Sequence, residues 1–259
     1  GEGGWDICQD NILKGKSNFR NDLTGARHPR CVVYSIGIGE DTTSSNTTVY
    51  DPTCGSGSLL LKVGDAATSD VTLYGQEYDN ATAALAQMNM ILHDNPTAQI
   101  MQGNTLSTPK FMEHGNLKTF DYIVANPPFS DKRWSNGLTP NQDEFERFQH
   151  YGTPPDKQGD YAYMLHIIRS LKSNGKAAVI LPHGVLFRGN AEETIRKNIL
   201  TRGYIKAIIG LPANLFYGTG IPACIIVLDK SQATIRDGVF MIDASEGFKK
   251  DGPKNRLNE

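Results

Sequence analysis

The sequence lacks any strong excess of charge, and this limits how the protein can meet a polyanion. Its 259 residues carry 26 Lys and Arg against 28 Asp and Glu, which gives a net charge of -2. No positive field over the whole surface can therefore hold nucleic acid. Any such affinity must come from a local basic patch or from a partner.

Cysteine pairs and long apolar runs are also lacking. The four cysteines (Cys8, Cys31, Cys54 and Cys224) show no Cys-x-x-Cys spacing, which argues against a zinc site and favours a reduced, intracellular protein. We find no signal peptide, no apolar stretch long enough to span a bilayer and no internal repeat. The expected protein is a cytoplasmic α/β domain with a sizeable core, without a metal site or a membrane anchor.

One stretch stands out for the chemistry that it can perform. The apolar run 120–125 predicts a buried strand, and it ends in Asn126, Pro127, Pro128 and Phe129. Pro128 holds Pro127 extended, so the Pro127 carbonyl is free to accept a hydrogen bond, and the Asn126 side chain offers a second carbonyl. Two acceptors beside an aromatic ring suit a planar exocyclic amine. The alternative is a turn that ends a strand with an aromatic plug.

A second candidate site is a glycine turn between a strand at 48–50 and an apolar helix. Glycines let the backbone approach a ligand closely, and a helix N-terminus presents free N–H groups. The dinucleotide fingerprint needs a third glycine where Leu60 stands, and an acid at the strand tip would repel a pyrophosphate. The turn instead suits a cationic amino-acid moiety such as that of S-adenosylmethionine, with an ordinary glycine turn as the alternative. The residues concerned are Asp51, Thr53, Gly55, Ser56 and Gly57.

The next two strands are expected to bring further polar groups to the same edge of the sheet. The strand at 71–76 ends at Glu77, and an acid at this position hydrogen-bonds ribose hydroxyls in folds of this kind. A strand at 98–102 is followed by Asn104, Thr105 and Leu106. The spacing leaves two roles open for Asn104, a contact to the cofactor's adenine edge or the cap of a turn.

Two other segments carry specific expectations. The helix that begins near Asp79 is expected to turn one apolar face to the core. After Phe129 comes a polar loop in which Lys132, Arg133 and Trp134 are the candidates for contacts to phosphates and bases, and a solvated surface loop is the alternative. The predicted core face of the helix consists of Ala81, Ala84, Leu85, Met88, Ile91 and Leu92.

The second half of the chain alternates between helical and strand-like patterns. His183, at the end of a predicted strand, is interpreted as structural. The count reaches seven strands, and an aromatic, glycine-rich connection containing Phe216 joins the last two. A further strand-like run at 31–36 lies upstream. The remaining elements are predicted as helices over 160–171 and 191–200 and strands over 176–181, 205–211 and 223–228.

Taken together, these motifs resemble the class I methyltransferase fold. More narrowly, the chain is similar to the methyltransferase (modification) subunit of type I restriction-modification systems, which makes N6-methyladenine in DNA. Several independent motifs follow the family's order, and the match covers roughly residues 47 to 257. The stretches that carry it are 50–61, 74–77, 88–93, 125–129, 181–189, 210–219 and 240–245.

The resemblance implies a Rossmann-like, seven-stranded, mostly parallel sheet with helices on both faces. It implies a catalytic domain over 47–230, after an N-terminal segment over 1–46 and before a C-terminal extension over 231–259. Asn126, Pro127, Pro128 and Phe129 would be catalytic, and Phe129 and Phe216 would stack on the target base. S-adenosylmethionine would bind to Asp51, Thr53, Gly55, Ser56, Gly57, Glu77, Asn104, Thr105, Leu106 and Asn126.

The resemblance also implies partners. The substrate would be DNA, and because the chain has no evident target-recognition domain, a separate specificity subunit would supply sequence recognition. A second copy of the modification subunit would flank it, and a restriction subunit can join. Two rivals remain. One is a non-catalytic cofactor-binding scaffold of such a complex, and the other is a methyltransferase of the same fold that acts on protein glutamine or RNA.

The chain departs from the family's pattern in three ways. A Gly-Glu-Phe-Tyr-Thr-Pro-like motif is usual before the first strand, but Gly39 and Glu40 run straight into Asp41. We hypothesise that a segment is missing there, which an intact mass of 28.4 kDa would contradict. Asn104 stands where an Asp is usual. The helical N-terminal region and the C-terminal helices that contact partners are lacking or cut short.

Overall fold

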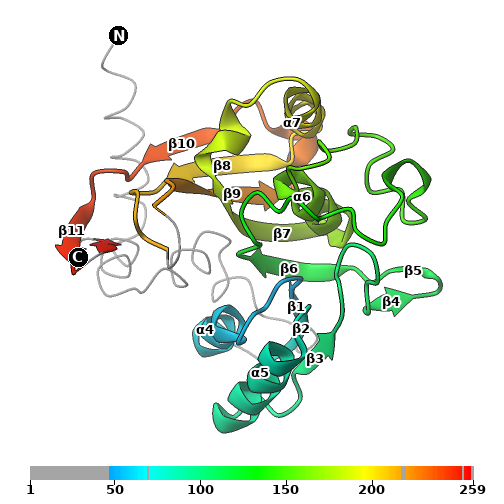
Figure 1. The fold of residues 1–259 in the computed structure, drawn as a ribbon, viewed down its shortest axis with the longest axis vertical. Coiled ribbons are helices and arrows are strands. Elements are labelled where there is room, and N and C mark those ends of the chain that lie inside the picture. Colours follow the sequence, from blue (N-terminus) through cyan, green and yellow to red (C-terminus); the bar gives the residue numbers. More distant parts are fainter. Residues whose placement is uncertain (1–46, 69, 217–219, 253, 258–259) are drawn as a thin grey trace.

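The fold is organised by one large mixed sheet. The computed structural model describes residues 47–68, 70–216, 220–252 and 254–257, and the strand expected over 31–36 lies outside them. In the described part, eight strands form the sheet in the order β10-β8-β9-β7-β6-β1-β2-β3 (Figure 1). These strands are β1 (Thr47–Asp51), β2 (Val71–Glu77), β3 (Gln99–Gln102), β6 (Phe120–Ala125), β7 (Leu171–Pro182), β8 (Ile205–Gly210), β9 (Ala223–Asp229) and β10 (Phe240–Asp243).

All neighbouring strands in this sheet are parallel except those that pair with β9, which runs antiparallel to both β7 and β8. β1 lies between β2 and β6, so the chain first builds outward on one side of β1 and then returns to its other side. The carboxyl ends of strands at such a switch point are where open α/β sheets bind ligands. The topology therefore predicts a site at the ends of β1, β2 and β6.

Helices cover both faces of the sheet. The buried side chains of α6 and α7 belong to one apolar cluster, and those of α4 and α5 belong to a second. The two clusters share the sheet between them, which is the layered arrangement that buries both faces of a largely parallel sheet. The helices are α4 (Ser58–Ala66), α5 (Asn80–Leu92), α6 (Asp160–Arg169) and α7 (Ala191–Thr201).

Several smaller elements lie outside the main sheet and its helices. The short strands β4 (Met112–Glu113) and β5 (Asn116–Leu117) form one hairpin, and β11 (Phe248–Asp251) and β12 (Lys254–Leu257) form another. Three 3-10 turns, η1 (Pro140–Gln142), η2 (His183–Leu186) and η3 (Ala233–Ile235), lie in connections. The sheet has one strand more than predicted. The additional strand, β10, pairs in parallel with β8 and lies within the predicted C-terminal extension.

The predicted core face of α5 is wrong. Its apolar residues, Leu85, Met88, Ile91 and Leu92 among them, are exposed, whereas Ala83, Ala86 and Met90 are buried. The reason is steric. A Cβ at Gly57, whose φ is +80°, would lie 2.5 Å from the Met90 methyl and 3.6 Å from Ala86. Ala86 and Met90 therefore pack directly against the turn at Gly57, and this contact fixes which face of α5 is buried.

The prediction for the helix after Asp160 is wrong at its end. The helix stops at Arg169, and β7 begins at Leu171, although the apolar periodicity continues through Leu171. Leu171 aligns with Phe120 in the β6–β7 pairing, and a bulge follows before the ladder resumes at Lys176. Strand pairing with β6 therefore overrides the helical pattern. The other boundaries in this half lie within one residue of prediction, apart from the earlier start of β7.

Candidate active site

The predicted cofactor residues meet at the carboxyl edge of the sheet. β1 ends at Asp51 and β2 ends at Glu77, and the two strands pair along their length. β6, on the other side of β1, ends one residue before Asn126. The two acids and the asparagine therefore come from three neighbouring strands.

The glycine turn after β1 is held by its own backbone. Asp51 is buried, and its Oδ1 accepts the N–H of Thr53 at 2.9 Å. Gly55 has a φ of +54°, a left-handed conformation that glycine adopts without a Cβ penalty. The Gly57 N–H donates to the Cys54 carbonyl at 2.8 Å, and α4 begins at the next residue. The turn thus presents the N-terminus of α4 beside the Asp51 carboxyl.

Glu77 connects this turn to the second strand. Its Oε2 accepts the N–H of Gly55 at 3.0 Å, and its Oε1 accepts the N–H of Asp79 at 2.8 Å. Burial, and to a smaller extent the nearby charge of Glu77, raises the pKa of Asp51 to about 7. Within the described residues neither carboxylate forms an ion pair. A cationic ligand group would favour the ionised form of Asp51.

The third strand's loop is built as a capped turn. The Asn104 Oδ1 accepts the N–H groups of Leu106 and Ser107, at 2.9 and 3.2 Å. Thr105 is buried, and its hydroxyl donates to the carbonyl of Pro52. Of the two roles left open for Asn104, the structure shows the cap. Thr105 and the buried Leu106 act as supports that tie this loop to the first turn.

The Asn126 motif presents free acceptors. The Asn126 side chain is exposed and forms no hydrogen bond with any residue that the structure describes, while Pro127 is buried behind it. Phe129 is half-buried and meets Phe216 with ring centroids 5.7 Å apart and an interplanar angle of 72°. Because the rings are nearly perpendicular, a planar base can stack on the face of one and touch the edge of the other. The two rings do not form a parallel sandwich in this arrangement.

The residue after this motif is clamped by groups that the sequence analysis missed. The Ser130 N–H donates to Oδ1 of the fully buried Asp160 at 2.7 Å, and Gln158 donates to the Ser130 hydroxyl at 2.7 Å. Arg188, from the connection after β7, binds both Asp160 and Glu192, each at 2.5 Å. Ser130 itself is left-handed, with a φ of +53°. The only sequence signal was the acid at the start of the predicted helix.

Asp131 is held as firmly as Ser130. Its carbonyl accepts the N–H of Gly159 at 3.0 Å, and its Oδ2 accepts the Tyr163 hydroxyl at 3.1 Å. Trp134, a candidate for base contact, is instead buried, and its ring nitrogen donates to the Pro155 carbonyl at 2.9 Å. Lys132 and Arg133 are exposed. Of the three loop candidates, only these two cations remain available to a ligand.

A buried network links this loop to the cofactor side. Arg147 is fully enclosed, pairs with Asp143 at 2.6 Å, and donates to the carbonyl of Leu106 at 2.8 Å. It also lies 3.3 Å from His166, and burial beside this cation lowers the pKa of His166 well below its usual range. The loop after Phe129 therefore packs onto the turn that carries Asn104.

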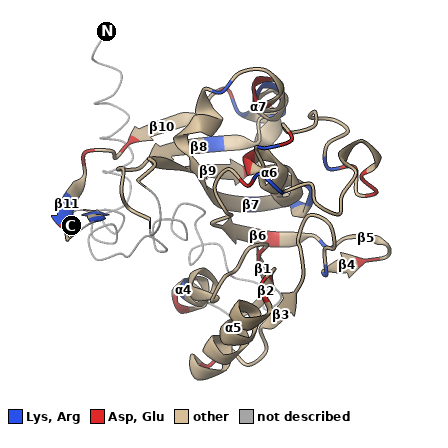
Figure 2. Cartoon of the chain, in the orientation of Figure 1, with Lys and Arg blue, Asp and Glu red and all other residues tan. Residues whose placement is uncertain are grey.

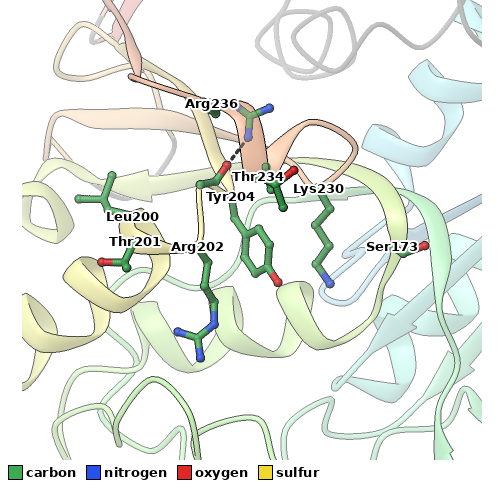
Figure 3. A pocket seen from close by; sticks show the side chains of 10 residues that line it. Ser173, Leu200, Thr201, Arg202, Tyr204, Lys230, Thr234 and Arg236 are labelled. Carbon is green, nitrogen blue, oxygen red and sulfur yellow. Dashed lines mark hydrogen bonds between the residues drawn. The ribbon is translucent and has the colours of Figure 1, made fainter.

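A separate hollow of about 820 Å³ lies away from these residues, beside the start of β8 (Figure 3). Its cations are engaged by carbonyl groups. Arg236 binds the Gly203 carbonyl, and Lys230 binds the carbonyls of Ile168 and Leu171. The cationic ends point in different directions in Figure 3 and do not converge on one point. We therefore assign no part of the chemistry to it.

Two kinds of feature are absent from the described part of the chain. No group of three or more His, Cys, Asp or Glu side chains in it is placed to hold a metal ion. None of its helices is both long and apolar enough to cross a membrane.

Comparison with known proteins identifies relatives. Residues 29–259 match the family N-6 DNA methylase. The type I restriction enzyme MpnII methylase subunit of Mycoplasma pneumoniae is 38% identical over 234 residues, which are 86% of this chain and 42% of that protein. The MjaVII methylase subunit of Methanocaldococcus jannaschii is 34% identical over 243 residues, 88% of this chain and 40% of that protein.

A solved structure of a related protein is also similar to this chain. The type I restriction-modification system methyltransferase subunit from Streptococcus thermophilus has a TM-score of 0.80 at 36% identity, over 92% of this chain and 51% of that one. The chain thus spans less than half the length of these curated relatives and about half of the solved one. Because the family match covers most of the chain, the chain belongs to the N-6 DNA methylase family and has the class I S-adenosylmethionine-dependent methyltransferase fold.

Proposed function

We propose that the chain is the catalytic part of a type I modification subunit, which transfers a methyl group from S-adenosylmethionine to N6 of adenine in DNA. The observation that carries this proposal is the exposed Asn126 carboxamide beside the Phe129 and Phe216 rings, one strand away from Asp51. The family match and the names of the relatives, all methylase subunits, support it.

The residues at the edge of the sheet fit S-adenosylmethionine. Asp51 would hold the cationic amino group of the methionine part, and Glu77 would accept hydrogen bonds from the ribose hydroxyls. The turn at Gly55 leaves room for the close approach of a ligand, since a Cβ there would meet nothing within 4 Å. Asn104, Thr105 and Leu106 would border the adenine. When bound, the cofactor supplies an electrophilic methyl group.

The target amine needs activation because its lone pair is delocalised into the adenine ring. The Asn126 side-chain carbonyl and the Pro127 backbone carbonyl would accept its two N–H groups and favour a pyramidal nitrogen whose lone pair faces the methyl group. This interaction strengthens toward the transition state, so it lowers the barrier rather than only binding substrate. Phe129 would stack on the base, and base–aromatic stacking is worth about 1–3 kcal/mol. That offsets part of the cost of taking the base out of the duplex.

Cysteine-based methylation of cytosine is disfavoured by the described thiols. Cys54 and Cys224 are both buried, and burial raises the pKa of each thiol far above its usual range. A nucleophilic cysteine needs the opposite, a lowered pKa and access to the substrate. Transfer to an exocyclic amine needs no covalent intermediate, which agrees with the free acceptors at Asn126.

We further propose that the protein works in the cytoplasm within an assembly. A specificity subunit would select the DNA sequence, a second modification subunit would complete the methyltransferase, and a restriction subunit can join. The names of the relatives, which call each a subunit of a type I enzyme, support this division of labour.

The test measures transfer of labelled methyl groups from S-adenosylmethionine to unmodified DNA by the complete protein, with and without its specificity subunit. Nucleoside mass spectrometry identifies the product. N6-methyladenine that appears only with the partner would support both the chemistry and the division of labour. Tight cofactor binding without any DNA product would instead favour a scaffold, or a methyltransferase acting on protein glutamine or RNA.

A further inference from the structure

The C-terminal hairpin concentrates positive charge. Strands β11 and β12 pair antiparallel, and the ten residues 248–257 contain four Lys or Arg and one Asp, in a chain whose net charge is -2. Figure 2 shows this cluster of blue at β11, on the side of the molecule toward which the β6 arrow points in Figure 1. The hairpin is therefore a basic element on the same side as the carboxyl end of β6.

The hairpin is attached to the loop that carries Phe216. The backbone N–H of Asn255 donates to the carbonyl of Asn214 at 3.0 Å, and its side-chain nitrogen donates to the carbonyl of Ala213 at 2.8 Å. Leu257 packs against the apolar cluster against which Phe129 and Phe216 also pack. One asparagine thus fixes the hairpin to the backbone beside the aromatic pair.

Three cations of the hairpin face solvent. Lys249, Lys250 and Arg256 are exposed. Within the described residues, the one acid that pairs with these cations is Asp251, whose carboxylate lies 3.5 Å from Arg256, and the two side chains are 60% and 56% exposed. An ion pair at such exposure is weak and screened by salt, so it leaves Arg256 able to bind another anion.

The pairing register places like charges together. Lys249 lies directly opposite Arg256, so both side chains project from the same face of the hairpin. Like charges opposite each other on a strand pair are destabilising. Asp251, on the same face, offsets part of that repulsion, and a bound anion would relieve the rest. The register is a second observation, independent of the charge count, that points to an anionic ligand.

We propose that the β11–β12 hairpin binds the DNA phosphate backbone next to the target adenine. The inference rests on the proposed function, because it takes the ligand of the Phe129 and Phe216 site to be a DNA base. A base that enters this site brings its flanking phosphates with it, and the attached hairpin presents cations beside the same loop. Phosphate contacts of this kind fix position and supply affinity without reading sequence.

The test replaces Lys249→Gln, Lys250→Gln and Arg256→Gln together in the complete protein assembled with its specificity subunit. Binding to a short unmethylated DNA duplex is measured over a series of salt concentrations. Each lost phosphate contact should make the slope of log affinity against log salt shallower by about 0.9. Lys249 and Arg256 share one face of the hairpin and Lys250 projects from the other, so the loss of two or three contacts should reduce the slope by roughly 2 to 3, with affinity lower by about 10- to 100-fold at moderate salt.

A matched control removes the same charge elsewhere. Lys62→Gln, Lys118→Gln and Lys197→Gln together also remove three positive charges, from lysines that are paired with acids on other parts of the surface. This control should keep the salt slope of the unmodified protein to within one contact. Cofactor affinity should be unchanged in both triple variants, which shows that each is folded.

Two results would overturn the proposal. One is a salt slope in the hairpin variant equal to that of the control variant. The other is loss of the specificity subunit from the hairpin variant on gel filtration, which would make the hairpin a protein-docking surface. Failure of the proposed function looks different, because the unmodified assembly would then yield no N6-methyladenine while DNA binding could still depend on the hairpin.

Discussion

The proposed cofactor side and the proposed target side of this site are built in different ways. On the cofactor side, acidic and amide groups cap their own turns: Asp51 binds Thr53, Glu77 binds Asp79 and Asn104 binds Leu106, each two residues along the chain. On the target side, Ser130 is held by Asp160, which is 30 residues away. Arg188 reaches Asp160 from 28 residues on the other side. Local capping fixes each turn of the first half within a short motif, and Glu77 and Thr105 then join these turns to the first one. The contacts that hold Ser130, by contrast, form only once distant segments have met.

The largest effect should come from the acceptor that no described residue occupies. Asn126→Ala removes one of the two carbonyls proposed to bind the target amine. Removing one preorganised transition-state contact lowers kcat by about 100- to 1000-fold in other enzymes, and we expect a loss of that order here. Binding of S-adenosylmethionine, measured by calorimetry, should change little because the residues proposed to bind the cofactor lie mainly at the ends of β1 and β2. An equal loss of methyl transfer and of cofactor binding would show that Asn126 is structural.

The second-largest effect should come from removing Asp160, which holds Ser130 in place. Asp160→Ala leaves Ser130 and Arg188 without their shared partner, so the segment after Phe129 keeps only its contacts to Gln158, Gly159 and Tyr163 and is less firmly fixed. Misplacement by about 1 Å can cost around 100-fold in rate, and we expect a loss approaching that in methyl transfer with cofactor affinity retained. Fluorescence of 2-aminopurine at the target position measures whether the base still enters the site.

Asp160→Asn provides the conservative control for this prediction. The amide keeps an oxygen for the Ser130 N–H but loses the charge that pairs with Arg188, so it should recover a large part of the rate. If Asp160→Ala instead lowers cofactor affinity and methyl transfer in parallel, the residue stabilises the whole domain and is not specific to the target side.

The same contrast explains what the sequence could predict. Asp51, Glu77 and the glycine turn follow buried strands directly, so strand prediction alone brings them to one edge. Trp134 and the α5 face could not be interpreted in this way. In the sequence, Trp134 resembles an exposed aromatic residue, but in the structure its ring nitrogen donates to the Pro155 carbonyl. The outward face of α5 carries the larger apolar residues, so the apolar pattern predicts the wrong face. In both cases the deciding contact is made by a segment that has no periodicity of its own.

Asp51 should make cofactor binding depend on pH in a defined direction. Burial raises its pKa to about 7, so the group is mostly protonated at pH 6 and mostly ionised at pH 7.5. Because the ionised form is the one proposed to hold the cationic amino group, affinity should rise several-fold over this interval. Above about pH 8 it should fall again as an α-amino group loses its proton, since such groups titrate near 7.7–8.0. Affinity is measured by calorimetry at constant ionic strength.

The variant that checks this assignment is Asp51→Asn. It should bind the cofactor more weakly at pH 7.5 and lose the rise between pH 6 and 7.5. Without cofactor, the free energy of unfolding changes with pH in the opposite direction to the cofactor affinity. The folded state keeps a proton that the unfolded state releases near pH 4, so the contribution of Asp51 to the free energy of unfolding declines as pH rises from about 4 to 7. A rise in affinity between pH 6 and 7.5 that survives in Asp51→Asn would show that Asp51 is not the group responsible.

The smallest effect should be a gain, at the position where the family usually has an acid. The Asn104 Oδ1 is already occupied by the N–H groups of Leu106 and Ser107, so the remaining atom of the carboxamide is a donor. An adenine amino group is itself a donor, so the two cannot bond. Asn104→Asp keeps the cap and replaces the donor by a second acceptor. Hydrogen bonds to charged groups contribute about 1.5–3 kcal/mol, and after the cost of desolvating a new carboxylate we expect cofactor affinity to increase by about tenfold or less. Calorimetry with S-adenosylmethionine and with an analogue lacking the adenine amino group tests this contact. Only S-adenosylmethionine should bind more tightly to the Asn104→Asp variant. An equal gain for both ligands would mean that the new carboxylate acts through the capped turn and not through the adenine.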